Sequence, residues 1–308
     1  MMRFRAKLPA IAILIVLASG AAQCRAAAAG GQKLRVVATT GIVADLARNV
    51  GGDKIELVQL VPTGSDPHSF EPAPGDVVAL AEAQVILANG LGLEEFLAEL
   101  LENAGGRAAT VPVSTGVEVR QFGQAGEPAG EGPDPHIWTT PANAIVMVHN
   151  IERALSALDP ANAGTYAANA GAYAARLAEL DAWVRAQIEA IPPERRKLVT
   201  DHDAFGYYAD RYGLEVIGAV IPAYSASAEP SAQELAALQD AIGQFQVKAI
   251  FVGVSVNPVL AQRLAEDSGI QLVPLYTGSL GLPGSGAETY IGYIRYNTTA
   301  IVEGLTER

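Results

Sequence analysis

Histidine is scarce in this chain, and three of the histidines lie close to an aspartate in the sequence. The 308 residues include four histidines. Three of them have a close aspartate neighbour, in the segments Asp66–His68, Asp134–His136 and Asp201–Asp203. An imidazole binds zinc, copper, iron or nickel once its tautomer is fixed, and a carboxylate can fix it by accepting the other ring N–H. The candidate ligands of one divalent metal ion are His68, His136 and His202.

A simpler interpretation competes with the metal site. A single histidine in a loop is usually a solvated polar residue, and Asp-Pro dipeptides are also typical of turns. Repetition of Asp-Pro-His in two separate loops, with a third histidine between aspartates, favours the metal. From spacing alone both interpretations stay open. The fourth histidine, His149, lies beside the apolar stripe of a predicted helix, and we expect no role for it.

The elements that must position these residues alternate between strands and helices. In the first half, short apolar runs predict strands, and amphipathic stretches between them predict helices. This order favours a parallel sheet covered by helices. His68 lies in the Pro/Gly-rich loop after the second strand. The predicted strands are 34–38, 55–61 and 84–88, and the predicted helices are 42–50, one from about 75, and 93–103.

The second half begins with two helices. Apolar residues at helical spacing predict a helix over Pro141–Leu158 and, after Asp159 and Pro160, a second over about 161–190. At 1.5 Å per residue, this second helix would run about 45 Å and could join two lobes as a strut. Strands are then expected at 197–200, 214–220, 248–252 and 271–275, and helices at 231–245, 258–267 and 288–304.

His202 directly follows the first of these later strands, where ligands bind in open α/β sheets. The pattern predicts two α/β lobes with a helical spine. Before the helix at Pro141–Leu158, the Gly-, Glu- and Pro-rich stretch Val119–Pro135 indicates a flexible surface loop, at most a weak cation-collecting lid.

The N-terminus has the order of a secretory signal. Basic residues precede the apolar run Leu8–Ala18, and small residues follow, so residues 1–28 are expected to be a signal peptide. The only cysteine, Cys24, lies where the signal ends. It is either a lipid-attachment site or removed with the signal. No later apolar stretch approaches the roughly 18–20 residues of a membrane span, so we expect an exported, periplasmic or otherwise extracytoplasmic protein.

Composition argues against several function classes. Half of the residues are hydrophobic, which indicates a globular chain, and the net charge is −12. An acidic surface repels nucleic acid and anionic lipid, so neither is an expected partner. The sequence has no phosphate-binding G-x-x-x-x-G-K-[ST] loop and no strand-linked G-x-G-x-x-G, which argues against nucleotide binding.

Several motifs together resemble a known family. The segments Asp66–Pro72, Asp134–Trp138 and Thr200–Tyr207 are similar to those of the zinc and manganese solute-binding proteins of ABC importers. Asp159-Pro160 before a long helix, and Ile250-Phe-Val near Asn257-Pro258, are similar too. The resemblance covers residues 34–308. It implies a metal receptor and not an enzyme, expected to be a monomer, which delivers its cargo to a membrane permease.

The resemblance also implies an architecture. Each of two lobes has a mainly parallel four-stranded sheet, and a long rigid backbone helix joins them. The metal lies in the cleft between the lobes. On this basis we expect an N-terminal metal-binding lobe at 34–158, a linking helix at 159–191 and a C-terminal metal-binding lobe at 195–308.

Carried over by position, His68 and His136 correspond to the family's two N-lobe ligands and His202 to the third. A histidine at the third position is common in zinc receptors, whereas many manganese receptors have Glu. Zinc is therefore the expected cargo, with manganese or iron as the alternative. The sequence departs from the family at Gly278, where an Asp ligand is usual, and at Gly253, where a Glu is common. Water could complete the site, or a supporting carboxylate from Asp66, Glu71 or Asp134.

Two further functions remain as alternatives. Three histidines with an open position are typical of catalytic zinc, and Glu71 or Asp203 could act as a general base in a zinc-dependent hydrolase. However, the H-E-x-x-H pattern of many zinc hydrolases is absent from the sequence. A surface adhesin with a structural metal is the other alternative, but no aromatic cluster in the sequence argues for it.

Overall fold

The computed structural model describes residues 33–105, 108–121, 132–223 and 229–306. The predicted signal peptide and Cys24 lie outside these ranges. Among the described residues, no helix is both long enough and apolar enough to cross a membrane.

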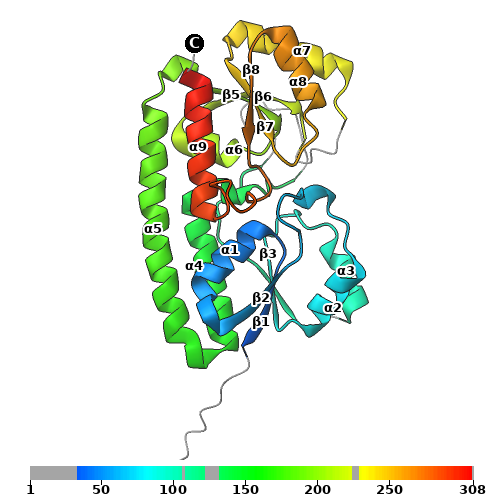
Figure 1. Ribbon diagram of the computed structural model, residues 1–308, viewed down its shortest axis with the longest axis vertical. Coiled ribbons are helices and arrows are strands. Elements are labelled where there is room, and N and C mark those ends of the chain that lie inside the picture. Colours follow the sequence, from blue (N-terminus) through cyan, green and yellow to red (C-terminus); the bar gives the residue numbers. More distant parts are fainter. Residues whose placement is uncertain (1–32, 106–107, 122–131, 224–228, 307–308) are drawn as a thin grey trace, which may run out of the picture. The chain divides into compact units, whose positions relative to one another are not determined.

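The first lobe is built on a parallel sheet of four strands in the order β2-β1-β3-β4. The central strands β1 and β3 are almost wholly buried, because helices cover both faces of the sheet (Figure 1). This confirms the parallel sheet expected from the alternating pattern. Its elements are β1 Leu34–Ala38, α1 Gly41–Gly51, β2 Ile55–Gln59, α2 Pro74–Glu82, β3 Val85–Ala88, α3 Leu97–Ala104 and β4 Ala109–Pro112.

Two antiparallel helices follow, α4 (Pro141–Leu158) and α5 (Ala163–Glu189). The Thr140 side chain caps α4 by accepting a hydrogen bond from the N–H of Asn143, at 3.3 Å. With 27 residues, α5 is about 40 Å long. It packs against α1 and α4 on one side of the molecule and against α6 and α9 further along its length, so it adjoins both lobes (Figure 1). The predicted helical spine is confirmed.

The second lobe repeats the sheet order of the first. Its four parallel strands are arranged β6-β5-β7-β8. Helix α7 begins with a capping box, in which Ser231 and Glu234 exchange backbone and side-chain hydrogen bonds. The elements are β5 Lys197–His202, α6 Gly206–Tyr212, β6 Glu215–Ile221, α7 Ala232–Phe245, β7 Ala249–Gly253, α8 Val259–Ser268, β8 Gln271–Leu275 and α9 Tyr290–Thr306.

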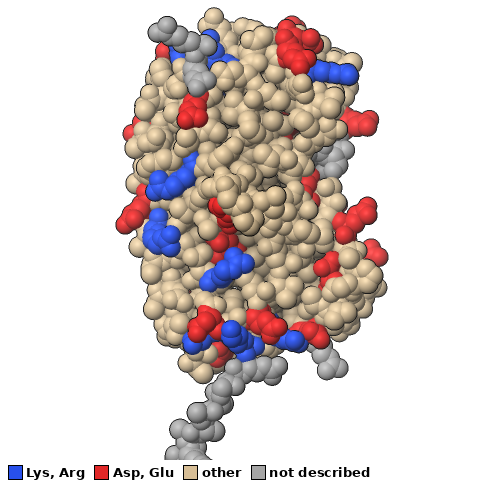
Figure 2. Space-filling model, viewed as in Figure 1, with Lys and Arg blue, Asp and Glu red and all other residues tan. Residues whose placement is uncertain are grey.

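The main hydrophobic core extends through both lobes, since it contains residues of β1, α1, α4, α5, α6, β7 and α9. Polar ties reinforce it. The N–H of Tyr290, at the start of α9, donates to the buried carboxylate of Asp45 in α1 at 3.0 Å. On the face shown in Figure 2, acidic and basic side chains are interspersed and form no single charged patch. The two lobes are therefore joined by a shared hydrophobic core and by specific polar contacts.

Candidate metal centre

The three predicted ligands converge between the two sheets. Each of His68, His136 and His202 offers a ring nitrogen, and these nitrogens all lie within 4.8 Å of one another. No other such cluster of three or more His, Cys, Asp or Glu residues occurs in the part of the chain that the structure describes. His136 and His202 are buried and His68 is partly buried. The ligands come from three different loops or strand ends, which only the tertiary fold brings together.

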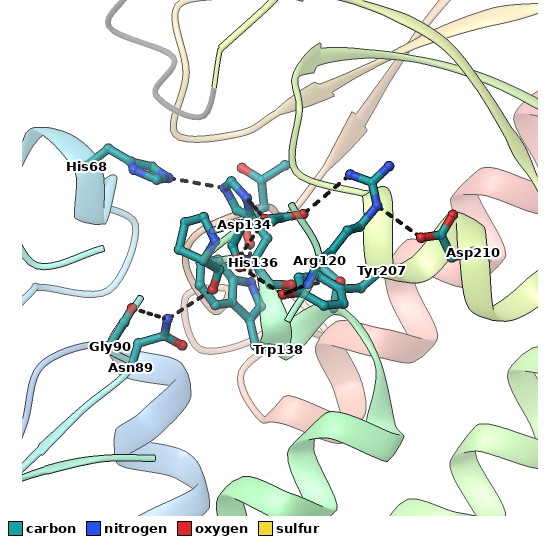
Figure 3. Close-up of polar contacts among 12 residues, drawn as sticks. His68, Asn89, Gly90, Arg120, Asp134, His136, Trp138, Tyr207 and Asp210 are labelled. Atoms are coloured by element: carbon teal, nitrogen blue, oxygen red, sulfur yellow. Dashed lines mark hydrogen bonds and ion pairs between the residues drawn. The ribbon is translucent and has the colours of Figure 1, made fainter. Parts of the chain in front are cut away.

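Asp134 holds His136 in two ways. Its Oδ1 accepts the backbone N–H of His136 at 2.9 Å and lies 2.8 Å from the ring Nδ1 (Figure 3). A proton on Nδ1 leaves the lone pair of Nε2 directed away from the carboxylate. Behind the loop, the amide of Asn89 donates to the carbonyl of Pro135 at 3.0 Å. His136 therefore presents Nε2 from a rigid support.

Asp201 holds His202 by the same chemistry. Its Oδ1 accepts the backbone N–H of His202 at 2.9 Å and lies 3.0 Å from the ring Nδ1. Its other oxygen accepts the N–H of Gly253 at 2.9 Å. A Cβ at Gly253 would lie 2.5 Å from the Thr277 hydroxyl, so a side chain there would have to displace Thr277. Gly253 thus contributes a backbone donor to Asp201.

His68 is positioned by a short turn. Residues Pro67–Ser69 form one 3-10 turn, which Asp66 caps by accepting the N–H of His68 at 3.0 Å. The Nε2 atoms of His68 and His136 lie 3.2 Å apart. Two nitrogens on one tetrahedral zinc, each bound at 2.0–2.1 Å, would lie about 3.3 Å apart. The two rings therefore already have the spacing that a shared ion requires.

Burial and neighbouring charges set the protonation of the three rings. Burial, together with His136 and His202, lowers the pKa of His68 to about 3. Burial and His202 likewise lower the pKa of His136 well below its usual value. For His202, burial is outweighed by the charge and hydrogen bond of Asp201, and the pKa is raised. Near neutral pH, His68 and His136 are thus neutral and able to bind a cation without losing a proton.

The two supporting aspartates differ electrostatically. Burial raises the pKa of the Asp134 carboxyl to about 7, although the N–H of His136 and the charge of Arg120 both oppose the shift. Asp201 is as deeply buried, but His202 and the N–H of Gly253 hold its pKa below the usual value. Asp201 is therefore the firmly ionised member of the pair.

The loop after β8 contacts the segments that carry His68 and His136. The indole of Trp138 and the hydroxyl of Tyr293 both donate to the carbonyl of Thr277, at 2.9 and 3.1 Å. The next residue, Gly278, packs against Pro67: a Cβ at Gly278 would lie 2.6 Å from Pro67 Cδ. A side chain at this position has no room in the present arrangement. Gly278 thus allows a close contact between the lobes.

Of the predicted supporting carboxylates, only Asp134 contacts a histidine ring among the described hydrogen bonds. Asp134 contacts the ring of His136, whereas Asp66 bonds only to backbone among its described hydrogen bonds. Glu71 is exposed and lines a cavity of about 350 Å³ next to Asp66. His149 is exposed on α4, as its position beside the stripe predicts. Asp201 was not among the predicted supporting carboxylates, but its adjacency to His202 predicted a carboxylate on the ring, and it lies 3.0 Å from Nδ1 of His202.

The prediction of a surface loop over Val119–Pro135 is wrong at both ends. Residues 122–131 lie outside the described ranges, but Arg120 is only 8% exposed and Asp134 is fully buried. The charge on Arg120 is compensated by Asp134 and by Asp210, which is why it can be buried. The composition predicted that this stretch is exposed to solvent. Arg120 and Asp134 near its two ends are instead buried, and their ion pair makes this burial tolerable.

Comparisons with known proteins agree on one family. The family model described as "Zinc-uptake complex component A periplasmic" matches residues 36–304. The manganese-binding lipoprotein MntA of Halalkalibacterium halodurans is 33% identical over 96% of this chain and 97% of its own. The manganese ABC transporter substrate-binding lipoprotein PsaA of Streptococcus pneumoniae (strain TIGR4) is 34% identical over 96% of this chain and 95% of its own.

Solved structures give the same answer. The periplasmic zinc-binding protein TroA from Treponema pallidum superposes with a TM-score of 0.82 at 31% identity, covering 90% of this chain and all of that one. A manganese-bound periplasmic metal-binding protein from Candidatus Liberibacter asiaticus gives 0.79 at 27% identity, over 89% of this chain and all of that one. Two four-stranded lobes with a long connecting helix are thus shared with solved relatives.

Proposed function

The chain belongs to the family of metal-binding substrate-binding proteins of ABC transporters, and we propose that it binds zinc between its lobes through His68, His136 and His202. Membership makes the chain an extracytoplasmic solute-binding receptor. The metal is its cargo, so the site must hold the ion firmly and also release it.

One observation carries the choice of zinc: three imidazoles converge, and no carboxylate oxygen joins their cluster among the described residues. Imidazole suits zinc, whereas manganese prefers carboxylate and water oxygens. The contact between Gly278 and Pro67 leaves no room for an aspartate at the position where the family usually has one. We propose three histidines with solvent in the fourth position, while Asp134 supports His136 and Asp66 and Glu71 remain outside the ligand set.

Manganese or iron is the second candidate cargo. Its support is that several relatives carry manganese in their names, and one, MtsA of Streptococcus pyogenes, carries iron. These relatives share about a third of their residues with this chain, so one changed ligand position is compatible with the similarity. The ligand set in this chain is the reason for preferring zinc.

A competition experiment separates the two candidates. Metal-free protein would be dialysed against an equimolar mixture of zinc, manganese and iron(II) under anaerobic conditions, and the retained metal measured by mass spectrometry. We expect close to one zinc per chain and little manganese or iron. Retention of manganese in preference to zinc would refute the proposed cargo and leave the family assignment intact.

The remaining sequence-based expectations become part of the proposal. We propose that residues 34–158 and 195–308 are the two lobes and that 159–191 links them, since the first sheet ends with β4 and the second begins with β5. Delivery to a membrane permease, a monomeric state and the absence of catalysis are proposed from family membership. For export, a lipid on Cys24 is supported by the name lipoprotein in MntA and PsaA.

A further inference from the structure

Arg120 is a buried cation that reaches from one lobe to the other. It lies after β4 in the first lobe, and its side chain is 7% exposed. Its Nε donates to Oδ2 of Asp210, in α6 of the second lobe, at 3.0 Å. A terminal nitrogen lies 3.8 Å from Oδ2 of Asp134, the residue whose other oxygen contacts the ring of His136 (Figure 3). The three charged groups therefore form a chain from α6 to a candidate metal ligand.

The guanidinium has little freedom to leave this position. It packs directly on Gly206 at the start of α6, where a Cβ would overlap it. The hydroxyl of Tyr207 accepts the N–H of Arg120 at 3.0 Å and donates to the carbonyl of Asp134 at 2.9 Å. The N–H of Asp134 in turn donates to the carbonyl of Arg120 at 2.9 Å. Backbone and side chain are thus both fixed against α6.

The same β-α unit carries the third ligand. His202 is the last residue of β5, and α6 with Asp210 follows it after a short connection. A displacement that carries His202 away from His136 would also separate Asp210 from Arg120. Two links then join the lobes at this point, the metal between the histidines and the ion pair between Arg120 and Asp210. If the ion pair favours metal binding, the metal favours the ion pair by the same free energy, since coupling between two sites is reciprocal.

Resting on the proposed function, we propose that Arg120 is a positioning residue that couples contact between the lobes to the strength of metal binding at His136. Asp210 accepts a hydrogen bond from Arg120, and Arg120 forms an ion pair with Oδ2 of Asp134. Oδ1 of Asp134 orients the imidazole of His136. Arg120 itself touches no metal. Partners that hydrogen-bond a metal ligand commonly affect affinity by about 10-fold to 100-fold, and Arg120 acts one contact further from the metal, through Asp134.

A double-mutant cycle tests the coupling. Zinc dissociation constants would be measured by chelator competition for wild type, Arg120→Gln, Asp210→Asn and the double variant. We expect each single variant to weaken binding about tenfold, the lower end of the usual range for such partners. We expect the double variant to be little worse than either, since both act through one connection. Arg211→Gln is the matched control, because Arg211 pairs with Asp181 and not with Asp134.

A spectroscopic readout separates positioning from a purely structural role. Cobalt(II) replaces zinc as the probe, and its visible d–d bands report the geometry at the ligands. We expect Arg120→Gln and Asp210→Asn to change these bands while metal-free thermal unfolding stays cooperative. Arg120→Lys, which keeps the charge but loses the planar fork, should fall between wild type and Arg120→Gln. It also keeps the test decisive if Arg120→Gln fails to fold.

Three results would overturn the inference: unchanged zinc affinity in Arg120→Gln or Asp210→Asn, additive losses in the double variant, or unaltered cobalt bands. Failure of the proposed function would look different. Wild-type protein would then bind zinc weakly or not at all, before any variant is compared.

Discussion

The three imidazoles at the centre are supported unequally. His136 and His202 each have an aspartate on Nδ1, whereas the aspartate beside His68 bonds to its backbone N–H. An aspartate on Nδ1 fixes the tautomer and makes the ring a better donor to metal. His136 and His202 should therefore contribute most of the affinity, and His68, which is partly exposed, should complete the site.

Replacing the ligands one at a time tests the site. We expect His68→Ala, His136→Ala and His202→Ala each to weaken zinc binding by about 100-fold or more, because each removes one direct donor from an ion that prefers four. Isothermal titration calorimetry would measure the loss. His149→Ala is the control, since His149 is exposed on α4, and its affinity should match wild type. Wild-type affinity in any of the first three would remove that residue from the site.

Asp201→Asn tests the support of His202. The amide is close in size but has no charge, so the Nδ1 proton of His202 loses an ionised acceptor. We expect zinc affinity to fall about 10-fold to 100-fold, as is usual for such partners. Asp240→Asn, an exposed change on α7, should have no effect. Equal affinities for the two variants in chelator competition would argue that Asp201 acts only on the backbone.

At the scale of elements, strand ends and loops bring the ligands together. His202 ends β5 at the carboxyl edge of its sheet, where open α/β folds place ligands. The loop after β8 is held by Trp138 and Tyr293 and places Gly278 against Pro67. Because His68 is the next residue after Pro67, this contact between the lobes directly affects the first ligand.

Gly278→Ala should disturb that contact. The new Cβ would lie 2.6 Å from Pro67 Cδ, so the two loops must move apart and His68 must move with them. We expect several-fold weaker zinc binding and faster release, measured by stopped-flow chelation. Gly243→Ala on α7 is the matched control, since a Cβ there meets nothing within 4 Å. A gain in affinity for Gly278→Ala would show that the loops are free to adjust.

At the scale of the whole molecule, the metal ligands lie on both lobes. His68 and His136 come from the segments between β2 and α4, and His202 comes from β5. A bound ion would therefore join the lobes in addition to the shared core, α5 and α9. Because the site exists only in the folded chain, binding and folding stability are linked.

Zinc should raise the unfolding temperature. At free zinc about 100 times the dissociation constant, binding adds about 2.7 kcal/mol. At an unfolding entropy of about 2.1 cal/mol/K per residue, that corresponds to roughly 4–5 °C in Tm for a chain of this size. Differential scanning calorimetry with and without zinc would measure the shift, and an excess of chelator should reverse it. His202→Ala should show little shift, and a wild-type Tm that ignores zinc would contradict a site shared by the lobes.

Local patterns were enough to predict most elements. Helices α4 and α7 and strand β8 lie where the pattern of apolar residues predicted them, because that signal depends on neighbours in the chain. Strand β4 had no such signal: it is a four-residue edge strand with mostly exposed side chains. Its identity depends on pairing with β3, and only the family resemblance predicted a fourth strand.

By itself the sequence determined the three candidate ligands, since residue type and an adjacent aspartate are local properties. The tertiary structure decided what surrounds them. Arg120 is buried because Asp210, ninety residues away in the chain, compensates its charge. Gly278 contacts Pro67 only because the lobes meet there. Such contacts join residues that are distant in the chain and form only when the two lobes pack together. Local sequence patterns therefore cannot predict them.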